Sequence, residues 1–313
     1  MLRWVMAFVT LFSLDIAAAQ SWSPDRAVTI LNPYAAGSTT DQLARALAAG
    51  MAPRLGQPVV VVNRDGAAGG VGTAQAARAA PDGHYLLFAP AVVFSVLPAR
   101  GEVGFTAASF TPICQSFENA MAIAVRPESP FTSLADLVAA ARARPGALTY
   151  GHQGVASIPH LAAIDLAEVA GVQVQDVPYR GEPAVVTDLR AGRVDFAVLV
   201  MGSLAAGGLR TLGVFAPERH PLLPEVPTVM EQGFAVAPTS FGGLFAPAGT
   251  PPAAIARLEA ACLEAARDEA HRNVGARMFQ PTRPEADAAS LAARLARDIA
   301  DKRRLLGLIQ EAR

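Results

Sequence analysis

Lysine is almost absent from this sequence. Of its 26 basic residues, only Lys302 is lysine and the rest are arginine. Schiff-base enzymes need a lysine amine, and P-loop nucleotide-binding proteins place a lysine on the phosphates. Lys302 lies in a charged C-terminal stretch, where we expect it on the surface of a helix. Both kinds of lysine chemistry therefore have almost no candidate residue.

The sequence also has no run of like charges and, beyond its first 20 residues, no long apolar run. The net charge is −1, without a polybasic segment, which argues against nucleic acid as a partner and against electrostatic attachment to a membrane surface. No segment after the N-terminus reaches the roughly 18 consecutive apolar residues that a membrane helix needs. We therefore expect no membrane-spanning helix in the remainder of the chain.

The N-terminus has the composition of a secretory signal peptide. Arg3 precedes the apolar run Trp4–Leu14, and the small residues Ala17–Ala19 follow it. These are the charged region, the apolar region and the cleavage site of such a peptide, and the apolar run is too short to span a bilayer. We expect residues 1–19 to be removed near Ala19, and the mature chain to be exported to the periplasm.

Only two cysteines are present, Cys114 in an apolar strand-like run and Cys262 on an amphipathic helix. An oxidising compartment permits a bridge between them, but their spacing does not predict one, and we expect two buried free thiols. Neither cysteine has a CxxC neighbour or metal-ligand spacing. We therefore expect no zinc or redox role, and no metal or cofactor.

The stretch Val28–Leu47 (VTILNPYAAGSTTDQLARAL) reads as a short buried strand, a glycine-containing turn and the start of a helix. The first N–H groups of a helix have no partner within it and lie at the positive end of its dipole, so a carboxylate bound there is stabilised without an arginine. Ser38 and Asp41 fit a capping box, and most capping boxes only start helices. Asp41 by itself is therefore better interpreted as structural.

Two more strand, turn and helix units follow. Val59–Val62 has the continuous β-branched composition of a parallel strand buried on both faces, and the Gly-rich turn 66–72 leads into a helix over Thr73–Ala80. Its glycines do not have the G-x-G-x-x-G spacing of a dinucleotide site. Tyr85–Phe88 is a third strand, and residues 89–91 form the turn that follows it. In parallel α/β sheets ligands gather at the carboxyl ends of the strands, where all three turns would lie.

A second α/β region begins within residues 110–125, which read as extended chain. Further strands are expected at 148–150, 172–177, 194–200 and 212–215, with helices at 161–170 and 228–232. The segment 241–251 reads as an apolar strand running back into the first lobe. Two long amphipathic helices, 252–267 and 284 to about 308, complete the chain. A chain of 313 residues with 52% apolar content exceeds what one core usually supports, so two lobes are expected.

The order of these motifs resembles the substrate-binding receptors of tripartite tricarboxylate transporters, often called Bug receptors, over nearly the whole mature chain. The motifs that carry the resemblance are NPYA with Gly37 and Thr40-Asp41, LGQPVVV at 55–61, Asn63-Arg64 with Gly66 and Gly69-Gly70, APDG at 80–83, PHL at 159–161, VPY at 177–179, Leu223-Pro224 with VPT at 226–228, and GLFAPAGTP at 243–251.

The resemblance implies an α/β, two-lobed type II periplasmic-binding fold with two crossing strands as hinge. Lobe 1 would comprise 20–119 plus 243–313, and lobe 2 would comprise 120–242. It further implies a monomer, without an enzymatic activity, that binds a small carboxylate ligand in the cleft, largely through backbone N–H groups, and delivers it to membrane transporter subunits. The implied ligand-binding residues are Tyr34, Ala35, Gly37, Ser38, Thr39, Asp41, Gly69, Gly70, Val71, Ala89 and Ala91 from lobe 1, and Gly154, Ser157, His160 and Tyr179 from lobe 2.

Two departures from the family pattern concern the pocket. Where family members often have P-G-G-G-T-D, this chain has residues 36–41 as AGSTTD, so two glycines become hydroxyl residues and the first turn becomes stiffer and more polar. The segment Val200–Leu204 is several residues shorter than usual. The second difference bears on the lobe 2 side of the pocket and on ligand size.

Two alternative functions remain. A secreted hydrolase could use Ser157 and His160, with His152 and Asp165 nearby, but the G-x-S-x-G elbow is absent and a histidine at a helix start is more often a cap or structural group. A receptor could instead present its ligand to a membrane sensor kinase, which the sequence does not distinguish from transport.

Overall fold

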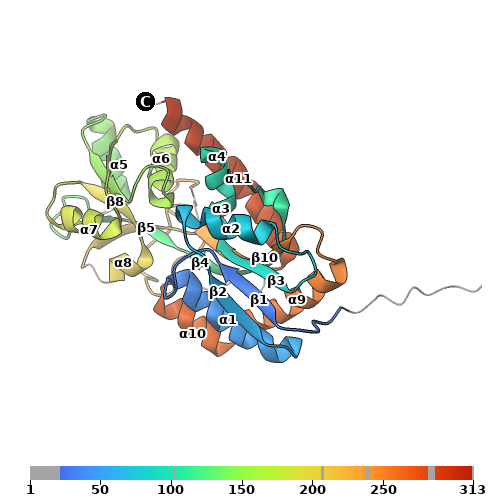
Figure 1. Ribbon diagram of the computed structural model, residues 1–313. Helices are drawn as coiled ribbons and strands as arrows, with labels where there is room; N and C mark the ends of the chain where they lie inside the picture. The colour runs from blue at the N-terminus through green and yellow to red at the C-terminus, as the bar shows by residue number, and fades with distance from the viewer. Residues whose placement is uncertain (1–21, 102, 206–207, 237–239, 281–285, 312–313) are drawn as a thin grey trace, which may run out of the picture.

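The computed structural model of the chain describes residues 22–101, 103–205, 208–236, 240–280 and 286–311. The expected signal peptide, 1–19, lies outside these residues. The described chain forms two lobes, each built on a five-stranded sheet with helices packed against it (Figure 1). No helix of the described chain is both long and apolar enough to cross a membrane.

Lobe 1 is built on a mixed sheet with the strand order β2-β1-β3-β10-β4. β1 pairs in parallel with β2 and β3, whereas β10 is antiparallel to β3 and β4. The strands are β1 (Val28–Asn32), β2 (Val59–Asn63), β3 (Tyr85–Pro90), β4 (Phe110–Asn119) and β10 (Ser240–Pro247). The helices are α1 (Thr39–Leu55), η1 (Ala67–Gly69), α2 (Gly70–Ala77), α3 (Val92–Ser95), α4 (Leu97–Arg100), η2 (Ala107–Ser109), α9 (Pro252–Ala266), α10 (Glu269–Arg277) and α11 (Ala288–Glu311).

Lobe 2 repeats this arrangement with the strand order β7-β6-β8-β5-β9. β6 is parallel to β7 and β8, and β5 is antiparallel to β8 and β9. The strands are β5 (Met121–Val125), β6 (Thr149–His152), β7 (Gln175–Pro178), β8 (Phe196–Val200) and β9 (Arg210–Phe215), and the helices are α5 (Leu134–Ala143), α6 (Ile158–Ala170), α7 (Glu182–Arg190) and α8 (Met201–Ala205).

The chain passes between the lobes where β4 runs into β5, with only Ala120 between them, and it returns to sheet 1 as β10. The expectation that 241–251 runs back into the first lobe is confirmed, since β10 lies between β3 and β4. This position demands glycine, because a Cβ at Gly243 would lie 2.0 Å from the carbonyl oxygen of Cys114. The β10 backbone therefore approaches β4 more closely than any other residue type would allow.

Both faces of the lobe 1 sheet are buried, each by a different helix layer. On one face α1 and α9 pack over β1, β3 and β4, in a core that includes Leu47, Phe88 and Phe117. On the other face α2, α3 and α11 pack over Leu87 and Phe245. The strands supply β-branched and aromatic side chains to both layers, and the helices supply alanine and leucine, which permit close packing.

Helix α11 contacts both lobes (Figure 1). Leu291 and Leu295 in its first half pack in the lobe 1 core. Leu305 and Leu306 in its second half pack with Leu161 of α6, in a cluster that also contains Val96 at the end of α3. This helix therefore joins lobe 1 to lobe 2 at a second place, away from the crossing strands.

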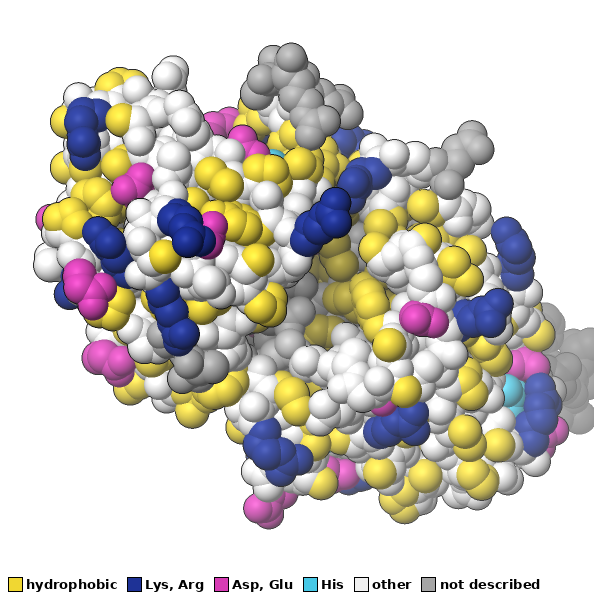
Figure 2. All heavy atoms as spheres, turned by 60° about the vertical axis from the view of Figure 1, so that its left-hand side comes forward, with side chains coloured by type: hydrophobic (Ala, Val, Ile, Leu, Met, Phe, Trp, Pro, Cys, Tyr) yellow, Lys and Arg dark blue, Asp and Glu magenta, His cyan; other side chains and the backbone are white. Residues whose placement is uncertain are grey.

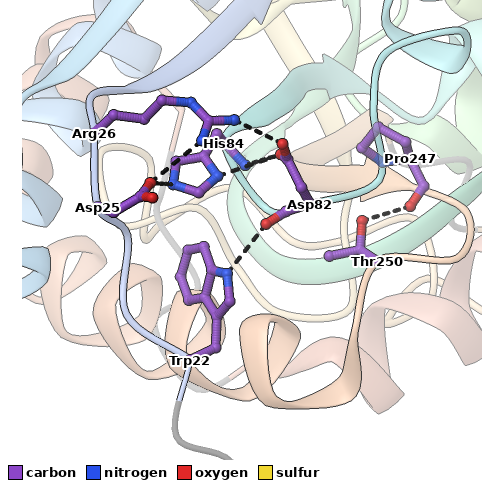
Figure 3. A network of polar contacts seen from close by, with 7 residues as sticks. All are labelled: Trp22, Asp25, Arg26, Asp82, His84, Pro247 and Thr250. Carbon is purple, nitrogen blue, oxygen red and sulfur yellow. Dashed lines mark hydrogen bonds and ion pairs between the residues drawn. The ribbon is translucent and has the colours of Figure 1, made fainter.

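The N-terminal segment of the described chain is fastened to the turn before β3 (Figure 3). The indole nitrogen of Trp22 donates to the carbonyl of Asp82 at 3.1 Å, and Arg26 pairs with the Asp82 carboxylate at 2.7 Å. His84 lies between two carboxylates, with Nε2 at 3.1 Å from Asp25 and Nδ1 at 3.3 Å from Asp82. These contacts fix the segment leading into β1.

Four sequence expectations differ from the structure. Lys302 is buried, because it forms an ion pair with Asp298 on the same face of α11. β2 is an edge strand with Val60 and Val62 exposed, since only β1 pairs with it. Residues 229–232 form turns instead of a helix, and Thr228 bridges to Val214. Helix α10 was not expected, because its sequence is mostly polar, and the residues it buries are His271 and Gly275.

The expectation of two free thiols is wrong, because Cys114 and Cys262 form a disulfide. Cys114 lies on β4 and Cys262 on α9, and both side chains are fully buried. Their 148-residue separation gave no sequence signal, because the bridge depends on how α9 packs across sheet 1. The bond ties the strand that leads into the hinge to the helix layer behind it.

We predict that replacing Cys114 and Cys262 together by alanine lowers the free energy of unfolding by roughly 2–5 kcal/mol, because the bridge restricts the unfolded chain. Urea unfolding at equilibrium measures the change. Adding a reducing agent that opens the disulfide should lower the stability of the wild type by a similar amount and leave the stability of the double variant unchanged. Equal unfolding curves for both proteins would show that the bridge contributes no stability.

Candidate functional site

The first candidate turn joins β1 to α1 at the carboxyl end of the lobe 1 sheet. Ser38 caps α1, and its hydroxyl oxygen accepts the amide of Asp41 at 3.3 Å. Gly37 adopts a φ of +81°, which glycine reaches without strain. In the described chain the amides of Thr39 and Thr40 have no protein acceptor, as the geometry of a helix start requires. Together with the helix dipole, these N–H groups form a site for an anion.

Asp41 serves the architecture of this turn. Its buried carboxylate accepts the Gly37 amide at 2.8 Å, Arg45 Nε at 3.0 Å and Asn63 Nδ2 at 2.9 Å. Burial would raise its pKa, but the hydrogen bonds from Arg45, Gly37 and Asn63 outweigh burial and hold the pKa below its usual value. The structural interpretation of Asp41 is therefore favoured over direct contact with a ligand carboxylate, which it would repel.

Two asparagines hold the first turn in place, and the sequence interpretation did not include them in the site. Asn32 and Asn63 are register partners at the ends of β1 and β2. Their side-chain amides both donate to the carbonyl of Tyr34, at 3.2 and 3.1 Å. An asparagine at the end of each of two strands was the available sequence signal, because the ends of paired parallel strands meet.

The second turn, between β2 and α2, is tightly wound. Ala67, Ala68 and Gly69 have positive φ values of 47°, 53° and 96°. The amides of Gly69, Gly70 and Val71 all bond within the turn, to the carbonyls of Gly66 or Ala67. The three residues expected to bind a carboxylate therefore lie at the carboxyl end of the parallel strands, as expected, but their amides already have acceptors. Two alanines held in the left-handed region store strain, a feature that clusters at binding sites.

Tyr34 joins the two turns to the third. A Cβ placed at Gly69 would lie 3.2 Å from the Tyr34 hydroxyl oxygen and 3.2 Å from Cγ1 of Val93 on α3. Burial raises the pKa of Tyr34 well above its ordinary value, so the hydroxyl keeps its proton. In the described chain this hydroxyl has no hydrogen-bond partner. It is therefore a donor placed where the three turns of lobe 1 converge.

Ala89 and Ala91 were expected near the ligand. Both are buried, Ala89 on β3 and Ala91 in the third turn that follows it. Ala89 pairs with Gly243 of β10, and the Ala91 amide donates to the carbonyl of Phe241 at 2.7 Å. Neither residue presents an available amide. Both position α3, whose Val93 contacts the Tyr34 turn.

The lobe 2 candidates surround the start of α6. Ser157 caps this helix, its oxygen accepting the His160 amide at 3.4 Å, and its hydroxyl proton remains available to another acceptor. Gly154 is half-buried in the preceding turn. Tyr179 donates its hydroxyl to Asp188 at 2.9 Å, so it can only accept from a ligand. His160 is 4% exposed, and its ring nitrogen Nδ1 accepts the Ala156 amide at 3.0 Å.

The structure brings the two sets of turns to the same region between the lobes. Val92 and Val96, at the third turn of lobe 1, pack with Val155, Ala156 and Ile158 at the start of α6. The space-filling view shows a hollow between the two lobes, with apolar and uncharged atoms over much of its visible wall and basic side chains at its upper edge (Figure 2).

The hydrolase geometry is not assembled. The oxygen of Ser157 caps α6 through the backbone amide of His160, and Asp165 pairs with Arg304 at 2.6 Å. Asp165 is therefore committed to α11 instead of orienting an imidazole, as the acid of a catalytic triad must.

The chain belongs to the tripartite tricarboxylate transporter receptor family, whose model matches residues 43–311. It is 35% identical over 251 residues to the UPF0065 protein in the tcbD-tcbE intergenic region of Pseudomonas sp. strain P51, covering 76% of this chain and 73% of that protein. It is 32% identical over 258 residues to the protein BugT of Bordetella pertussis, covering 79% of this chain and 78% of BugT. The expected resemblance is thus confirmed.

Solved structures agree with this assignment. A TctC solute-binding protein from Polaromonas, without ligand, superposes with a TM-score of 0.84 at 27% identity, covering 91% of this chain and 99% of that one. MatC from Rhodopseudomonas palustris, with bound malate, has a TM-score of 0.69 at 28% identity over 90% of this chain and 99% of MatC. A further R. palustris protein, with adipate, has a TM-score of 0.69 at 27% identity over 90% and 96%. The two-lobed fold is confirmed, and the family consists of solute-binding receptors, not enzymes.

We predict that the charge of Asp41 makes this turn sensitive to acid. Because the folded-state pKa is lowered, the stabilisation is complete above the unfolded value of about 3.9 and is lost as the pH falls through the folded value. Asp41→Asn should therefore destabilise the protein at neutral pH, and its difference from wild type should shrink below about pH 4. Urea unfolding across the acid range measures this difference. A constant difference would exclude a role for the charge.

We also predict that two neighbouring glycines respond differently to substitution. A Cβ at Gly72 would lie 2.5 Å from the Arg64 carbonyl oxygen and 2.9 Å from Cα of Pro33, so Gly72→Ala should cost about 1–3 kcal/mol of stability. Gly70 has a helical φ and its nearest neighbour would be 3.6 Å away, so Gly70→Ala should fold normally. Thermal unfolding of both variants tests the contrast, and equal losses would contradict it.

Proposed function

We propose that this chain captures a small carboxylate-bearing solute between its lobes, in the periplasm, and delivers it as a monomer to the membrane subunits of a tripartite tricarboxylate-type transporter. The observation that carries the proposal is that the turn between β1 and α1 holds the amides of Thr39 and Thr40, which have no acceptor in the described chain, and begins with Tyr34, whose hydroxyl lies beside the second turn at Gly69. Relatives of the same fold hold malate and adipate, which are dicarboxylates.

The carboxylate would bind to lobe 1 first. It would accept hydrogen bonds from the α1 amides and from Tyr34, with the helix dipole adding favourable charge. The amides of Ala35 and Gly37 differ in whether they already have an acceptor. Gly37 already donates to Asp41, whereas Ala35 has no acceptor in the described chain. Ala35 therefore joins the donor set, and Gly37, Ser38 and Asp41 shape it.

Lobe 2 would add contacts as the groove closes. The Ser157 hydroxyl proton is its best placed donor, and Gly154 allows the ligand to approach the backbone. In the second turn of lobe 1, Gly69, Gly70 and Val71 would form a wall, since their amides are used within the turn. Ligand binding would thus shift an existing equilibrium between open and closed arrangements.

Screening a library of carboxylates by thermal shift identifies the solute, because a ligand specific to the native state raises the melting temperature. We expect dicarboxylates such as malate and adipate to raise it, and neutral sugars to leave it unchanged. Shifts produced only by sugars or peptides would overturn the proposal.

We predict that Tyr34→Phe weakens binding of the identified carboxylate by roughly ten- to a hundredfold, the value of one hydrogen bond to a charged acceptor. The protein should fold normally, because in the described chain the hydroxyl has no protein partner to lose. Isothermal titration calorimetry measures the effect. Tyr85→Phe is the matched control, since the Tyr85 hydroxyl bonds Gln75 on the surface of lobe 1. Unchanged affinity in Tyr34→Phe would remove this residue from the site.

In this proposal α11 also restrains the two lobes, and we predict that Arg304→Ala makes the unliganded protein more open. Arg304 pairs with Asp165 and Glu168 of α6 and so holds lobe 2 to the end of α11. Its loss should make the unliganded protein more open, as seen in a larger radius of gyration by small-angle X-ray scattering. Arg26→Ala, which removes an ion pair within lobe 1, is the control. Identical scattering from wild type and Arg304→Ala would show that the pair does not restrain the lobes.

A further inference from the structure

A cluster of three potential metal ligands lies in lobe 2 and takes no part in the proposed carboxylate site. His152 ends β6, His160 lies in the first turn of α6, and Asp176 lies on the edge strand β7. One ligand atom from each residue lies within 4.8 Å of those of the other two. Both histidines are buried and Asp176 is exposed. Both imidazoles also hydrogen-bond the turn before α6, His152 at Gly154 and His160 at the Ala156 amide.

Each ring nitrogen of His152 has a polar neighbour. Nδ1 lies 2.8 Å from the carbonyl oxygen of Gly154 and 3.2 Å from the Gly154 nitrogen, so its role as donor or acceptor depends on the tautomer. Nε2 lies 3.1 Å from Oδ2 of Asp176. When Nδ1 carries the ring proton, the lone pair of Nε2 faces this carboxylate oxygen, an arrangement in which a divalent cation would attract both atoms.

A second imidazole lies against the first. The rings of His152 and His160 stack with centroids 4.0 Å apart and planes inclined by 5°. Two imidazole nitrogens and one carboxylate oxygen are ligands that Zn²⁺, Co²⁺ and Ni²⁺ prefer, whereas Mg²⁺ and Ca²⁺ prefer oxygen. Nε2 of His152 and Oδ2 of Asp176 are separated by nearly the ~3.3 Å expected for two ligands of one tetrahedral zinc ion.

An open groove reaches two of the three residues, His160 and Asp176. It encloses about 700 Å³ and lies between β7, α6 and the end of α11, with His160, Asp176 and Tyr150 in its wall. None of its lining residues belongs to the three turns of lobe 1. Water from the groove can fill the remaining coordination positions, as in zinc sites with three protein ligands.

We propose that His152, His160 and Asp176 bind one divalent transition-metal ion, such as Zn²⁺, at a site separate from the carboxylate groove. The hydrogen bond from Nδ1 to Gly154 orients His152, as outer contacts do in metal sites. Parallel rings cannot both direct a lone pair at one ion, so His160 must turn and release the Ala156 amide from its Nδ1.

Isothermal titration of Zn²⁺ into the untagged protein, previously stripped with a chelator and free of carboxylate ligand, tests the proposal. We expect one ion per chain, and with Co²⁺ the visible spectrum of a site containing nitrogen ligands. Binding should weaken as the pH falls, because protons compete with the metal ion for its ligands. The absence of heat and of a cobalt spectrum at neutral pH would mean that only a proton occupies the site, and would overturn the proposal.

Three variants locate the ion. Asp176→Asn and His152→Gln should each weaken Zn²⁺ binding about tenfold or more, and circular dichroism checks that they fold. Asp25→Asn is the matched control, because Asp25 also lies 3.1 Å from a histidine Nε2, that of His84, but without a second imidazole (Figure 3). If Asp25→Asn weakens binding as much as Asp176→Asn does, or if Asp176→Asn has no effect, the lobe 2 site is refuted.

Discussion

The register between β1 and β2 controls the geometry of the binding region. Because Asn32 lies opposite Asn63 in a parallel pair, both side-chain amides reach the carbonyl of Tyr34. Asn63 also reaches Asp41, whose other oxygen accepts the Gly37 amide. A slip of one residue would turn every side chain of β2 to the other face and disconnect this network. The directions of the α1 amides and of the Tyr34 ring follow from this one alignment.

The same network would allow lobe 1 to receive the proposed carboxylate while it buries an anion of its own. The negative charge of Asp41 is satisfied locally by Arg45, Asn63 and the Gly37 amide. Buried charges are tolerated when they are paired and hydrogen-bonded. Asp41 thus stabilises the turn without using the amides of Thr39 and Thr40, which have no acceptor in the described chain.

Much of this arrangement could be predicted from the sequence, because its signals are local. β-branched runs gave the strands, Ser38 and Ser157 gave the helix starts, and the apolar run at 241–251 gave the returning strand. What failed depends on partners distant in sequence. The disulfide requires α9 to lie across β4, and β2 is exposed because no further strand pairs with it. The predicted turns are present at the ends of the strands, but which of their amides lack an acceptor depends on turn geometry, such as the positive φ of Ala67 and Ala68.

The position of α11 sets how the two lobes can move. Its first half is packed in lobe 1 and its second half on α6, so a rotation of lobe 2 about the crossing strands would also move α6 against α11. Either α11 bends or α6 slides along it, and sliding would displace the end of α6 that carries Ser157 and His160. Small shifts between packed helices are a common form of domain closure. Lobe 2 would then respond to a ligand by moving its donor and its histidine pair as one unit, which couples the groove between the lobes to the edge of β7.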